Sequence, residues 1–465
     1  MIALPSTGLL EQLARAEVNS LDATASYLER IEDLDGEIGA FITVDADSAL
    51  KQAREADAAL SNGLLLGPLH GLPVALKDNI DSAGLRTTAG SSFFAEHVPE
   101  HDAEVARRLR DAGAVLLGKL SLHEFAYGAT NQNPHFGPCR NPWDLSRMPG
   151  GSSGGSGAAV AAGLCAAALG TDTGGSVRIP AALNGISALR PSIGRVSMRG
   201  VFPTTWTFDT VGPMARSVSD LAAFLAVLAG YDPEDPHSVD VPTDPYLPAP
   251  AGHLEGLRIG LPRNFFFEDV DSDIISLVRA AAQVFAMGGA ELVEIDLPGA
   301  AEAVETTTGI IRAEAFAIHR QRLLDRPEGF GEDVRRRLLL SGSVTGAEYG
   351  EHRQRARTWR RTVEQAFERV DLILSPSTGT TAPPADSEMI ETTQRLVRLT
   401  YGWSLAGLPA LSIPCGFSDS GLPVGLQLAA ARFREATLLR AGAAYQRSTD
   451  WHLREPKLSS SKGET

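Results

Sequence analysis

The sequence predicts an α/β protein whose large central sheet is mixed, mostly parallel and covered by helices on both faces. Short apolar runs bounded by glycine and proline recur along the chain and alternate with segments of helical periodicity. Hydrophobic residues make up 43% of the 465 residues and charged residues 21%, so the chain can bury a large core. Alanine and glycine are frequent, which favours helices packed closely against a sheet.

The individual elements follow from these patterns in chain order. Amphipathic patterns predict two helices within residues 6–34 and a third at 46–61, which ends at Asn62-Gly63. Further helices are predicted at 101–113, before Gly230, at 274–288, in a long region interrupted at 327–331 and 341–343, and from about 430 to 445. Strands are predicted at 38–45, 71–79, 114–119, 257–263, 291–298, 371–377, 408–414 and 421–430.

Composition divides the chain into five segments. We expect an N-terminal helical segment (1–65), a core (66–230), a proline-rich connection (231–256), a C-terminal part of the same α/β domain with a helical insertion that forms a pocket (257–455), and a flexible tail (456–465). No internal repeat is evident, so these segments are not copies of one unit.

Charge and cysteine content exclude several classes of protein. A net charge of −15 argues against broad electrostatic binding to nucleic acid or to an anionic membrane. The three cysteines are few, odd in number and far apart, so neither a disulfide framework nor a CxxC metal site is expected. The chain has no basic, apolar leader and no run of eighteen apolar residues. We therefore expect a cytoplasmic protein without a membrane span, a metal or a cofactor.

Residues 147–180 contain two turns rich in glycine and serine, at Gly150–Gly157 and Gly174–Ser176. The alanine-rich segment between them predicts one buried helix and one short strand, which would bring the second turn back to the first. Serines among glycines keep their hydroxyls uncovered. Lys77 stands at the end of the strand predicted at 71–79, so it joins these turns at one sheet edge if the strands are neighbours.

Three kinds of chemistry compete for these turns. A phosphate-binding loop would need a lysine directly after the glycines, and there is none. Gly150, Ser152 and Gly154 match the GxSxG motif, in which Ser152 would be a nucleophile served by a histidine, but no later histidine lies in an evident motif. The third interpretation uses Lys77 as a neutral base, Ser152 as a relay and Ser176 as the nucleophile.

Structural roles compete with these chemical ones. Lys77 alone would usually be a surface lysine paired with Asp78, and the glycines of the second turn could form only a tight turn. His123 and Glu124 lack the HExxH spacing of a metal site, which favours capping or packing. Cys139 has no histidine context and is better explained as a small buried side chain.

The motifs together resemble those of the amidase signature family. The similarity rests on GGSSGGSGAAVAAG, ALGTDTGGSVRIPAALNG and LRPSIGRVS, with GLPVALKDN upstream and LPALSIPCGF and GLPVGLQL downstream. It is strong over about 60–230, the amidase signature core, and looser over 370–450. The resemblance implies the amidase signature fold and a Ser–cis-Ser–Lys triad, in which Ser176 matches the nucleophile, Ser152 the serine after a cis peptide, and Lys77 the base.

The same resemblance assigns roles around the triad. The family's oxyanion hole, built from main-chain N–H groups, matches the loop of Thr173, Gly174 and Gly175 that leads to the nucleophile. Asp172 and Arg178 match an ion pair that braces this loop, and Ser153 matches a serine that supports the base or the loop by hydrogen bonding.

These matches predict a hydrolase that cleaves the C–N bond of a small amide through a seryl acyl-enzyme, with activity toward aryl esters or carbamates as well. The alternative within the family is the A subunit of a glutamine-dependent tRNA amidotransferase, which supplies ammonia to partner subunits. Ile179 stands where we expect a glutamine in that subunit, which favours a free-standing hydrolase. A homodimer is left open as the one protein partner.

We expect the acyl pocket to be walled by residues 200–208, by helices between 305 and 345, and by 401–403. Val201, Phe202, Trp206 and Phe208 would then favour an aryl or alkyl group over a charged one.

Overall fold

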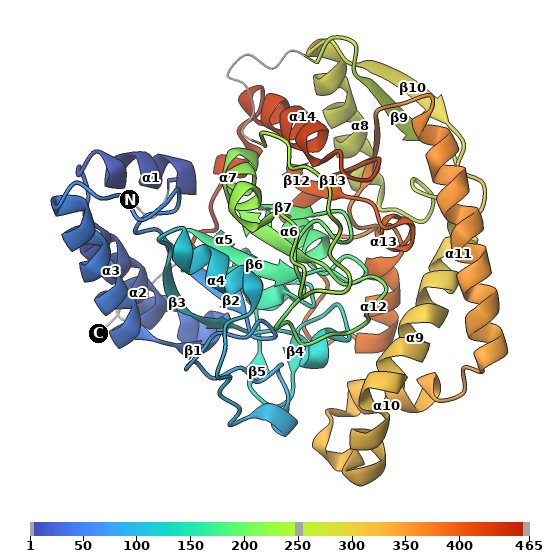
Figure 1. The fold of residues 1–465 in the computed structure, drawn as a ribbon. Helices are drawn as coiled ribbons and strands as arrows, with labels where there is room; N and C mark the ends of the chain where they lie inside the picture. Colours follow the sequence, from blue (N-terminus) through green and yellow to red (C-terminus); the bar gives the residue numbers. More distant parts are fainter. Residues whose placement is uncertain (1–3, 247–253, 459–465) are drawn as a thin grey trace.

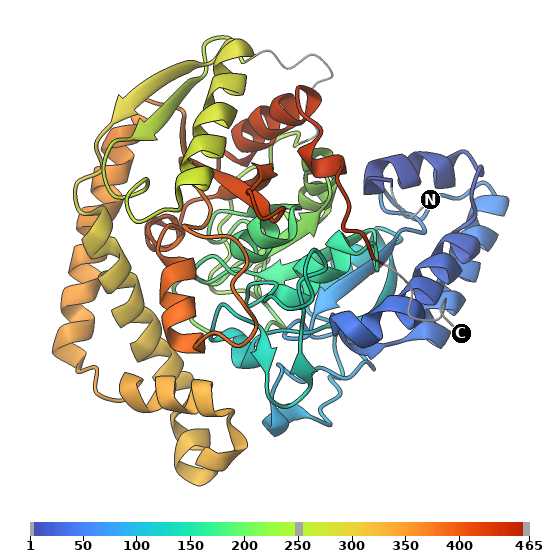
Figure 2. The same ribbon diagram turned by 180° about the vertical axis from the view of Figure 1, so that it is seen from behind.

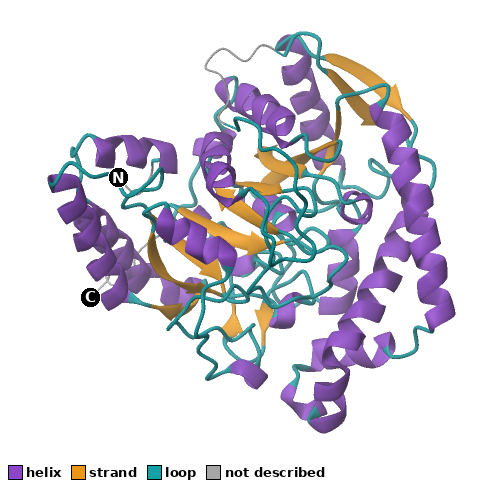
Figure 3. Cartoon of the chain, in the orientation of Figure 1, coloured by secondary structure: helices purple, strands orange, loops and turns teal. Residues whose placement is uncertain are grey.

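A computed structural model describes residues 4–246 and 254–458, and its centre is an eleven-stranded sheet within these residues (Figures 1 and 3). The strands are β1 Phe41–Val44, β2 Pro73–Lys77, β3 Val115–Leu120, β6 Ala167–Thr171, β7 Ser187–Arg190, β8 Val211–Ala215, β9 Arg258–Pro262, β10 Glu291–Ile295, β11 Leu372–Pro376, β12 Ala410–Phe417 and β13 Pro423–Ala430. Their order is β1-β3-β2-β6-β8-β7-β12-β13-β11-β9-β10. A separate hairpin joins β4 Gln132–Asn133 to β5 Gly137–Pro138.

The sheet is mixed, which confirms the predicted class. Parallel pairing joins β2 to both β3 and β6 near one edge, and β9 to both β11 and β10 near the other. The strands between these groups pair antiparallel, and so does β1 with β3. The parallel share is therefore smaller than expected, because short connections such as that between β12 and β13 return the chain directly along its neighbour.

Helices cover the sheet from both sides. They are α1 Ser6–Ala14, α2 Ser20–Ile38, α3 Ala46–Ser61, α4 Glu104–Asp111, α5 Gly154–Ala161, α6 Arg178–Asn184, α7 Val218–Leu228, α8 Ser272–Met287, α9 Ala300–Asp325, α10 Glu332–Ser341, α11 Gly346–Phe367, α12 Met389–Val397, α13 Tyr401–Ala406 and α14 Glu435–Arg447. Gly442 of α14 lies against Leu411 of β12, whereas Ala182 of α6 lies against Gly425, which pairs with Pro414 of β12. Leu411 and Pro414 lie on opposite faces of the sheet, so α14 and α6 cover opposite faces.

The two ends of the molecule carry different helices. Figures 1 and 2 place α1–α3 at one end and the long pair α9 and α11 at the other, with α10 between them in sequence. A second apolar cluster fills the space under α9 and α11 and includes Ile310, Trp359 and Trp403. Helices α6, α12 and α13 were not predicted from the sequence, because they are short and lie within turn-rich stretches.

The alanine-rich centre folds as the sequence predicts, into α5 followed by β6, and every residue of both is buried. A Cβ on Gly155 would lie 2.5 Å from the carbonyl oxygen of Ser121 and 2.6 Å from that of Ala40, so the glycine lets α5 approach the neighbouring backbone. Strands β2 and β6 pair in parallel, with Leu76 opposite Leu169. Lys77 and the loop after Thr171 therefore leave the sheet at the same edge.

Within residues 4–246 and 254–458, no helix is long and apolar enough to cross a membrane. The division into five segments stays a prediction, and residues 459–465 of the expected tail lie outside the described part.

Candidate active site

The side chain of Lys77 is completely buried at the end of β2. Its Nζ donates to Ser152 Oγ at 2.7 Å and to Thr171 Oγ1 at 2.7 Å, and lies 3.5 Å from the Thr171 carbonyl oxygen. Asn79 Nδ2 also donates to Thr171 Oγ1, at 3.2 Å. The competing interpretation of Lys77 as a surface lysine paired with Asp78 is wrong, because Asp78 pairs instead with the buried Lys119 at 3.0 Å.

Burial favours the uncharged form of the Lys77 amine. Removal of the amine from water lowers the pKa of Lys77 from 10.5 to about 7, although the carboxylates of Asp209 and Asp172 oppose this change. A neutral amine can direct its two N–H bonds at the oxygen atoms of Thr171. Its lone pair then faces Ser152.

The first glycine turn holds Ser152 and Ser153, both fully buried, and the Gly151–Ser152 peptide is cis. Ser153 Oγ donates to the carbonyl oxygen of Thr171 at 3.2 Å and accepts from the Thr171 N–H at 3.3 Å. The N–H of Ser153 donates to the carbonyl oxygen of Ser176 at 3.2 Å. The structure thus brings Lys77, Ser152 and the backbone of Ser176 together, while the catalytic roles of the three stay a proposal.

Hydrogen bonds to Thr400 and Asp172 fix the backbone of the second glycine turn. Thr400 Oγ1 donates to the carbonyl oxygen of Gly174 at 2.5 Å, and the Gly175 N–H donates to Asp172 Oδ1 at 2.8 Å. A Cβ on Gly174 would lie 2.3 Å from Cε1 of Tyr401, so only glycine fits there. The role of Gly175 in an oxyanion hole stays a prediction, and it requires the Gly175 N–H to be shared with or released by Asp172.

Other N–H groups of this turn face no protein acceptor. Within the described residues, no hydrogen-bond acceptor meets the N–H of Thr173, Gly174 or Ser176. Main-chain N–H groups without a protein acceptor beside a serine hydroxyl are available to stabilise a developing oxyanion.

A buried charge cluster braces the loop. Asp172 accepts from Arg178 Nε and Nη2, both at 3.0 Å, and from Arg190 Nη1 at 2.9 Å. These three side chains are completely buried. Burial opposes ionisation, but the two arginines outweigh it and hold the pKa of Asp172 well below its usual range. The sequence indicated the Asp172–Arg178 pair, whereas Arg190 was missed because nothing in LRPS marks it as a partner.

A small pocket contains Ser176, the only partly accessible member of the predicted triad at 8% exposure. It has a volume of about 40 Å³ and is lined by Ala126, Tyr127, Gly128, Ala129, Thr173, Gly174, Ser176, Thr204, Ile311, Arg337, Thr393, Val397 and Tyr401. An adjoining space of about 90 Å³ shares six of these residues and adds Val304, Thr308, Arg312, Leu340, Ile390 and Gln394. These volumes are well below the roughly 300–1,000 Å³ of pockets for drug-sized ligands.

The walls differ from those expected. Helices α9 and α10 and Tyr401 contribute as predicted, but Thr204 is the one residue of 200–208 that lines this pocket. Trp206 is 44% exposed and Phe208 is in the core, so neither faces Ser176. The aromatic side chains of the pocket are Tyr127 and Tyr401, and it also presents Arg312 and Arg337.

Comparisons with known proteins show the family to which the chain belongs. The family described as Amidase matches residues 22–439, which is most of the chain. The chain belongs to the amidase signature family. It is 44% identical over 473 residues to the A subunit of the glutamyl-tRNA(Gln) amidotransferase of Roseiflexus castenholzii, and the match covers 96% of each protein.

Solved structures match over nearly the whole chain. One comes from work on a vestigial protein complex and the origins of an s-triazine catabolic enzyme, with 34% identity, a TM-score of 0.92 and coverage of 98% of this chain and 100% of that one. Another is the peptide amidase of Stenotrophomonas maltophilia, with 33% identity, a TM-score of 0.86 and coverage of 97% and 98%. This amidase therefore acts on C–N bonds, as the sequence predicted.

Other candidate residues of this amidase have structural partners. His123 contacts Asp333 at 2.9 Å and Thr130 at 3.2 Å, and Glu124 accepts from the Gly331 N–H at 2.8 Å. These contacts tie the loop before the hairpin to α10. Among the described residues, no group of three histidine, cysteine, aspartate or glutamate side chains could hold a metal ion. Cys139 is buried, which raises the pKa of its thiol and disfavours a thiolate.

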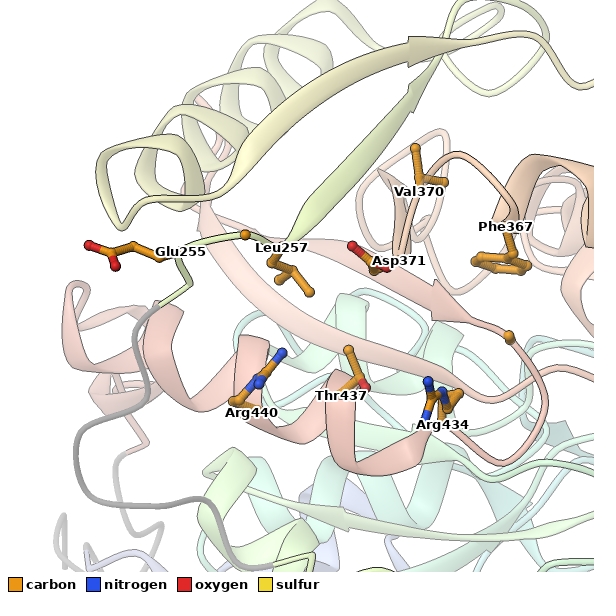
Figure 4. A pocket seen from close by; sticks show the side chains of 10 residues that line it. Glu255, Leu257, Phe367, Val370, Asp371, Arg434, Thr437 and Arg440 are labelled. Carbon is orange, nitrogen blue, oxygen red and sulfur yellow. The ribbon is translucent and has the colours of Figure 1, made fainter.

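The amidase has a larger hollow elsewhere. It measures about 350 Å³ and lies between the start of β9, the turn before β11 and α14 (Figure 4). Glu255, Asp371, Arg434 and Arg440 are among the residues that line it. It contains no residue of the predicted triad.

Proposed function

We propose that this amidase hydrolyses a small amide that carries a carboxylate or another anionic group beside the scissile carbonyl. The observation that carries this proposal is the charge of the pocket. Arg337 and Arg312 line it, and no aspartate or glutamate does. Arg337 is held by Asp333 at 3.0 Å, whereas Arg312 is half-buried and has no carboxylate within ion-pair distance among the described residues. A half-buried guanidinium without an anion suits an anionic substrate.

The proposed chemistry begins with neutral Lys77. Lys77 takes the proton of Ser152 Oγ, and Ser152 takes that of Ser176 Oγ, which forms a bond to the carbonyl carbon while the C=O electron pair moves to the oxygen. The free N–H groups of the second glycine turn stabilise that oxyanion. The proton returns through Ser152 to the leaving nitrogen as the C–N bond breaks. Water then cleaves the acyl-enzyme by the same relay, and an aryl ester or carbamate offers the same acyl carbon.

The second candidate is the A subunit of a glutamine-dependent amidotransferase. The 44% identity to such a protein favours it. Free glutamine, however, carries an α-ammonium group as well as a carboxylate. The pocket offers arginines for the carboxylate but no acidic side chain for the ammonium. Ile179, fully buried in α6, also departs from the glutamine expected in that subunit.

A substrate series tests the proposal. Succinamate should be hydrolysed with a higher kcat/KM than butyramide, which has a neutral methyl group in place of the carboxylate, and than glutamine. Arg312→Gln should raise KM for succinamate about 10-fold or more and leave butyramide nearly unchanged, because a charge-assisted hydrogen bond is worth about 1.5–3 kcal/mol. Arg320→Gln, at an exposed arginine of the same helix, is the matched control. Equal losses for both amides would contradict the assignment.

Glutaminase activity separates the two candidates. If the isolated chain prefers glutamine, or if hydrolysis requires subunits that co-purify with it, the amidotransferase interpretation replaces ours. Co-purification also tests whether the chain forms a homodimer. It further tests for another protein partner, since the similar structure from the s-triazine work belongs to a vestigial protein complex. We further propose a cytoplasmic location, supported by three free, buried cysteines.

A further inference from the structure

Asp209 is a buried carboxylate that the mechanism above does not use. It precedes β8 and is 9% exposed. Its Oδ1 accepts from Thr173 Oγ1 at 2.6 Å and from Thr205 Oγ1 at 3.2 Å. Its Oδ2 accepts from the N–H groups of Thr204 and Thr205 at 2.7 and 3.0 Å. Four donors thus hold the carboxylate in one place.

No cation is paired with this carboxylate. Among the described residues, no lysine, arginine or histidine nitrogen lies within 4.0 Å of it. Burial accordingly raises the pKa of Asp209, despite its four hydrogen bonds. Asp172 differs, because two arginines neutralise it. A buried carboxylate without a cation lowers the stability of the fold, and such a group is often retained for a functional reason.

Asp209 lies beside the segment that holds the amine of Lys77, because its donor Thr173 follows Thr171 by two residues and Thr171 Oγ1 accepts from Lys77 Nζ at 2.7 Å. Of the two carboxylates that raise the pKa of Lys77, Asp209 has the larger effect and Asp172 the smaller. Arg178 and Arg190 face Asp172 from α6 and β7 and offset its charge. The neighbouring Asp78 is offset by Lys119 in the same way. Asp209 has no arginine or lysine within ion-pair distance among the described residues, although its charge also acts on Arg190, which pairs with Asp172.

Catalysis creates a charge that needs such a partner. When the relay runs, the neutral amine becomes an ammonium at a fully buried position, and a fixed negative charge lowers the free energy of that state. We propose that Asp209 is a positioning residue of the reaction, whose carboxylate stabilises the ammonium formed when Lys77 takes the relayed proton and anchors Thr173 beside Ser176. This inference rests on the proposed triad. It gives the lysine the counter-charge that an aspartate gives to histidine in Ser-His-Asp enzymes.

The same hydrogen bonds shape the pocket. Thr173 and Thr204 both line the space in front of Ser176, and both are bound to Asp209. Thr204 Oγ1 also donates to the carbonyl oxygen of Phe125 at 3.1 Å. One carboxylate therefore fixes two walls of the acyl pocket as well as acting on the base.

The pH dependence of Ser176 labelling tests this inference without a known substrate. The probe is phenylmethanesulfonyl fluoride, with the second-order rate of inactivation measured from pH 5.5 to 9.5 and the adduct located by mass spectrometry. The wild-type rate should rise with pH through an apparent pKa near 7, that of Lys77. In Asp209→Asn this rise should move to lower pH by roughly 0.5–1 unit, and the plateau should fall about 10-fold, because the lysine loses its counter-charge and becomes a weaker base.

Two matched variants separate charge from packing. Thr173→Val removes one hydrogen bond to Asp209 but keeps the charge of the carboxylate. The apparent pKa of its inactivation rate should therefore stay within about 0.2 pH unit of the wild-type value, even if the maximal rate changes. Asp209→Glu keeps the charge and should behave likewise. If Asp209→Asn does not fold, Asp209→Ser leaves room for water at the freed N–H groups and replaces it. If the apparent pKa of the inactivation rate is the same in Asp209→Asn as in the wild type, the proposed role of Asp209 is wrong. If Lys77→Ala leaves the pH dependence of the wild type unaltered, the proposed triad is wrong instead.

Discussion

Replacement of Lys77 by methionine tests the central feature of this amidase, a buried amine that is neutral near pH 7. The side chain is fully buried, and the pKa of Lys77 falls from 10.5 to about 7. This change corresponds to about 5 kcal/mol of free energy, by which burial disfavours the charged amine. Methionine has a similar length and no charge. We therefore expect Lys77→Met to be inactive but more stable toward unfolding than wild type.

The size and sign of the gain depend on pH. Between pH 7 and 10.5 the unfolded chain holds a proton on Lys77 that the folded chain lacks. Over this range Lys77 thus makes the free energy of unfolding of the wild type rise by about 1.4 kcal/mol per pH unit. The stability difference between Lys77→Met and the wild type falls by the same amount. Loss of the hydrogen bonds to Ser152 and Thr171 offsets about 1–3 kcal/mol. The net gain at pH 7 should then be roughly 2–4 kcal/mol.

Urea unfolding at pH 6.5, 8 and 9.5 measures this difference. Lys119→Met is the contrasting control, because Lys119 pairs with the buried Asp78 at 3.0 Å. Its loss leaves that carboxylate unpaired, so this variant should be less stable by about 3–5 kcal/mol. A difference between wild type and Lys77→Met that does not change with pH would mean that the amine stays charged in the folded protein, and the proposed base would be wrong.

Four further outcomes follow from the structure. Ser176→Ala should lower kcat by about 10⁴-fold or more with an unchanged far-ultraviolet circular dichroism spectrum, since it removes the nucleophile; a residual rate near that of wild type would exclude Ser176. The kcat/KM of the wild type should rise with pH through a value near 7, set by Lys77, and stay level to about pH 9. Gly155→Ala should lower the unfolding free energy by at least about 2 kcal/mol in thermal melts, because its Cβ would lie 2.5 Å from a carbonyl oxygen. Iodoacetamide should not inactivate the native enzyme at pH 8, since all three thiols are buried and their pKa is raised; rapid inactivation would show that a cysteine is exposed.

The fold class and most elements were predictable from local patterns. Apolar runs ending in Gly, Pro or Asn predicted the strands, including β2, which ends at Lys77 as expected. The connection from α5 to β6 followed from an alanine-rich stretch between glycine turns. The order of the strands did not follow. Sheet neighbours such as β7 and β12 are separated by more than two hundred residues, and local periodicity carries no information about such pairing.

The amino-acid sequence by itself determined which residues were candidates for the chemistry. Lys77, Ser152 and Ser176 stand at a strand end and in two glycine turns, and such motifs are written in contiguous residues. Only the tertiary structure decided how the candidates behave. The pKa of Lys77 depends on burial from all sides and on Asp209, which is distant in sequence, and the charge of the pocket depends on Arg312, which a separate helix supplies. Desolvation and Coulomb energies sum over neighbours in space, so no stretch of sequence contains them.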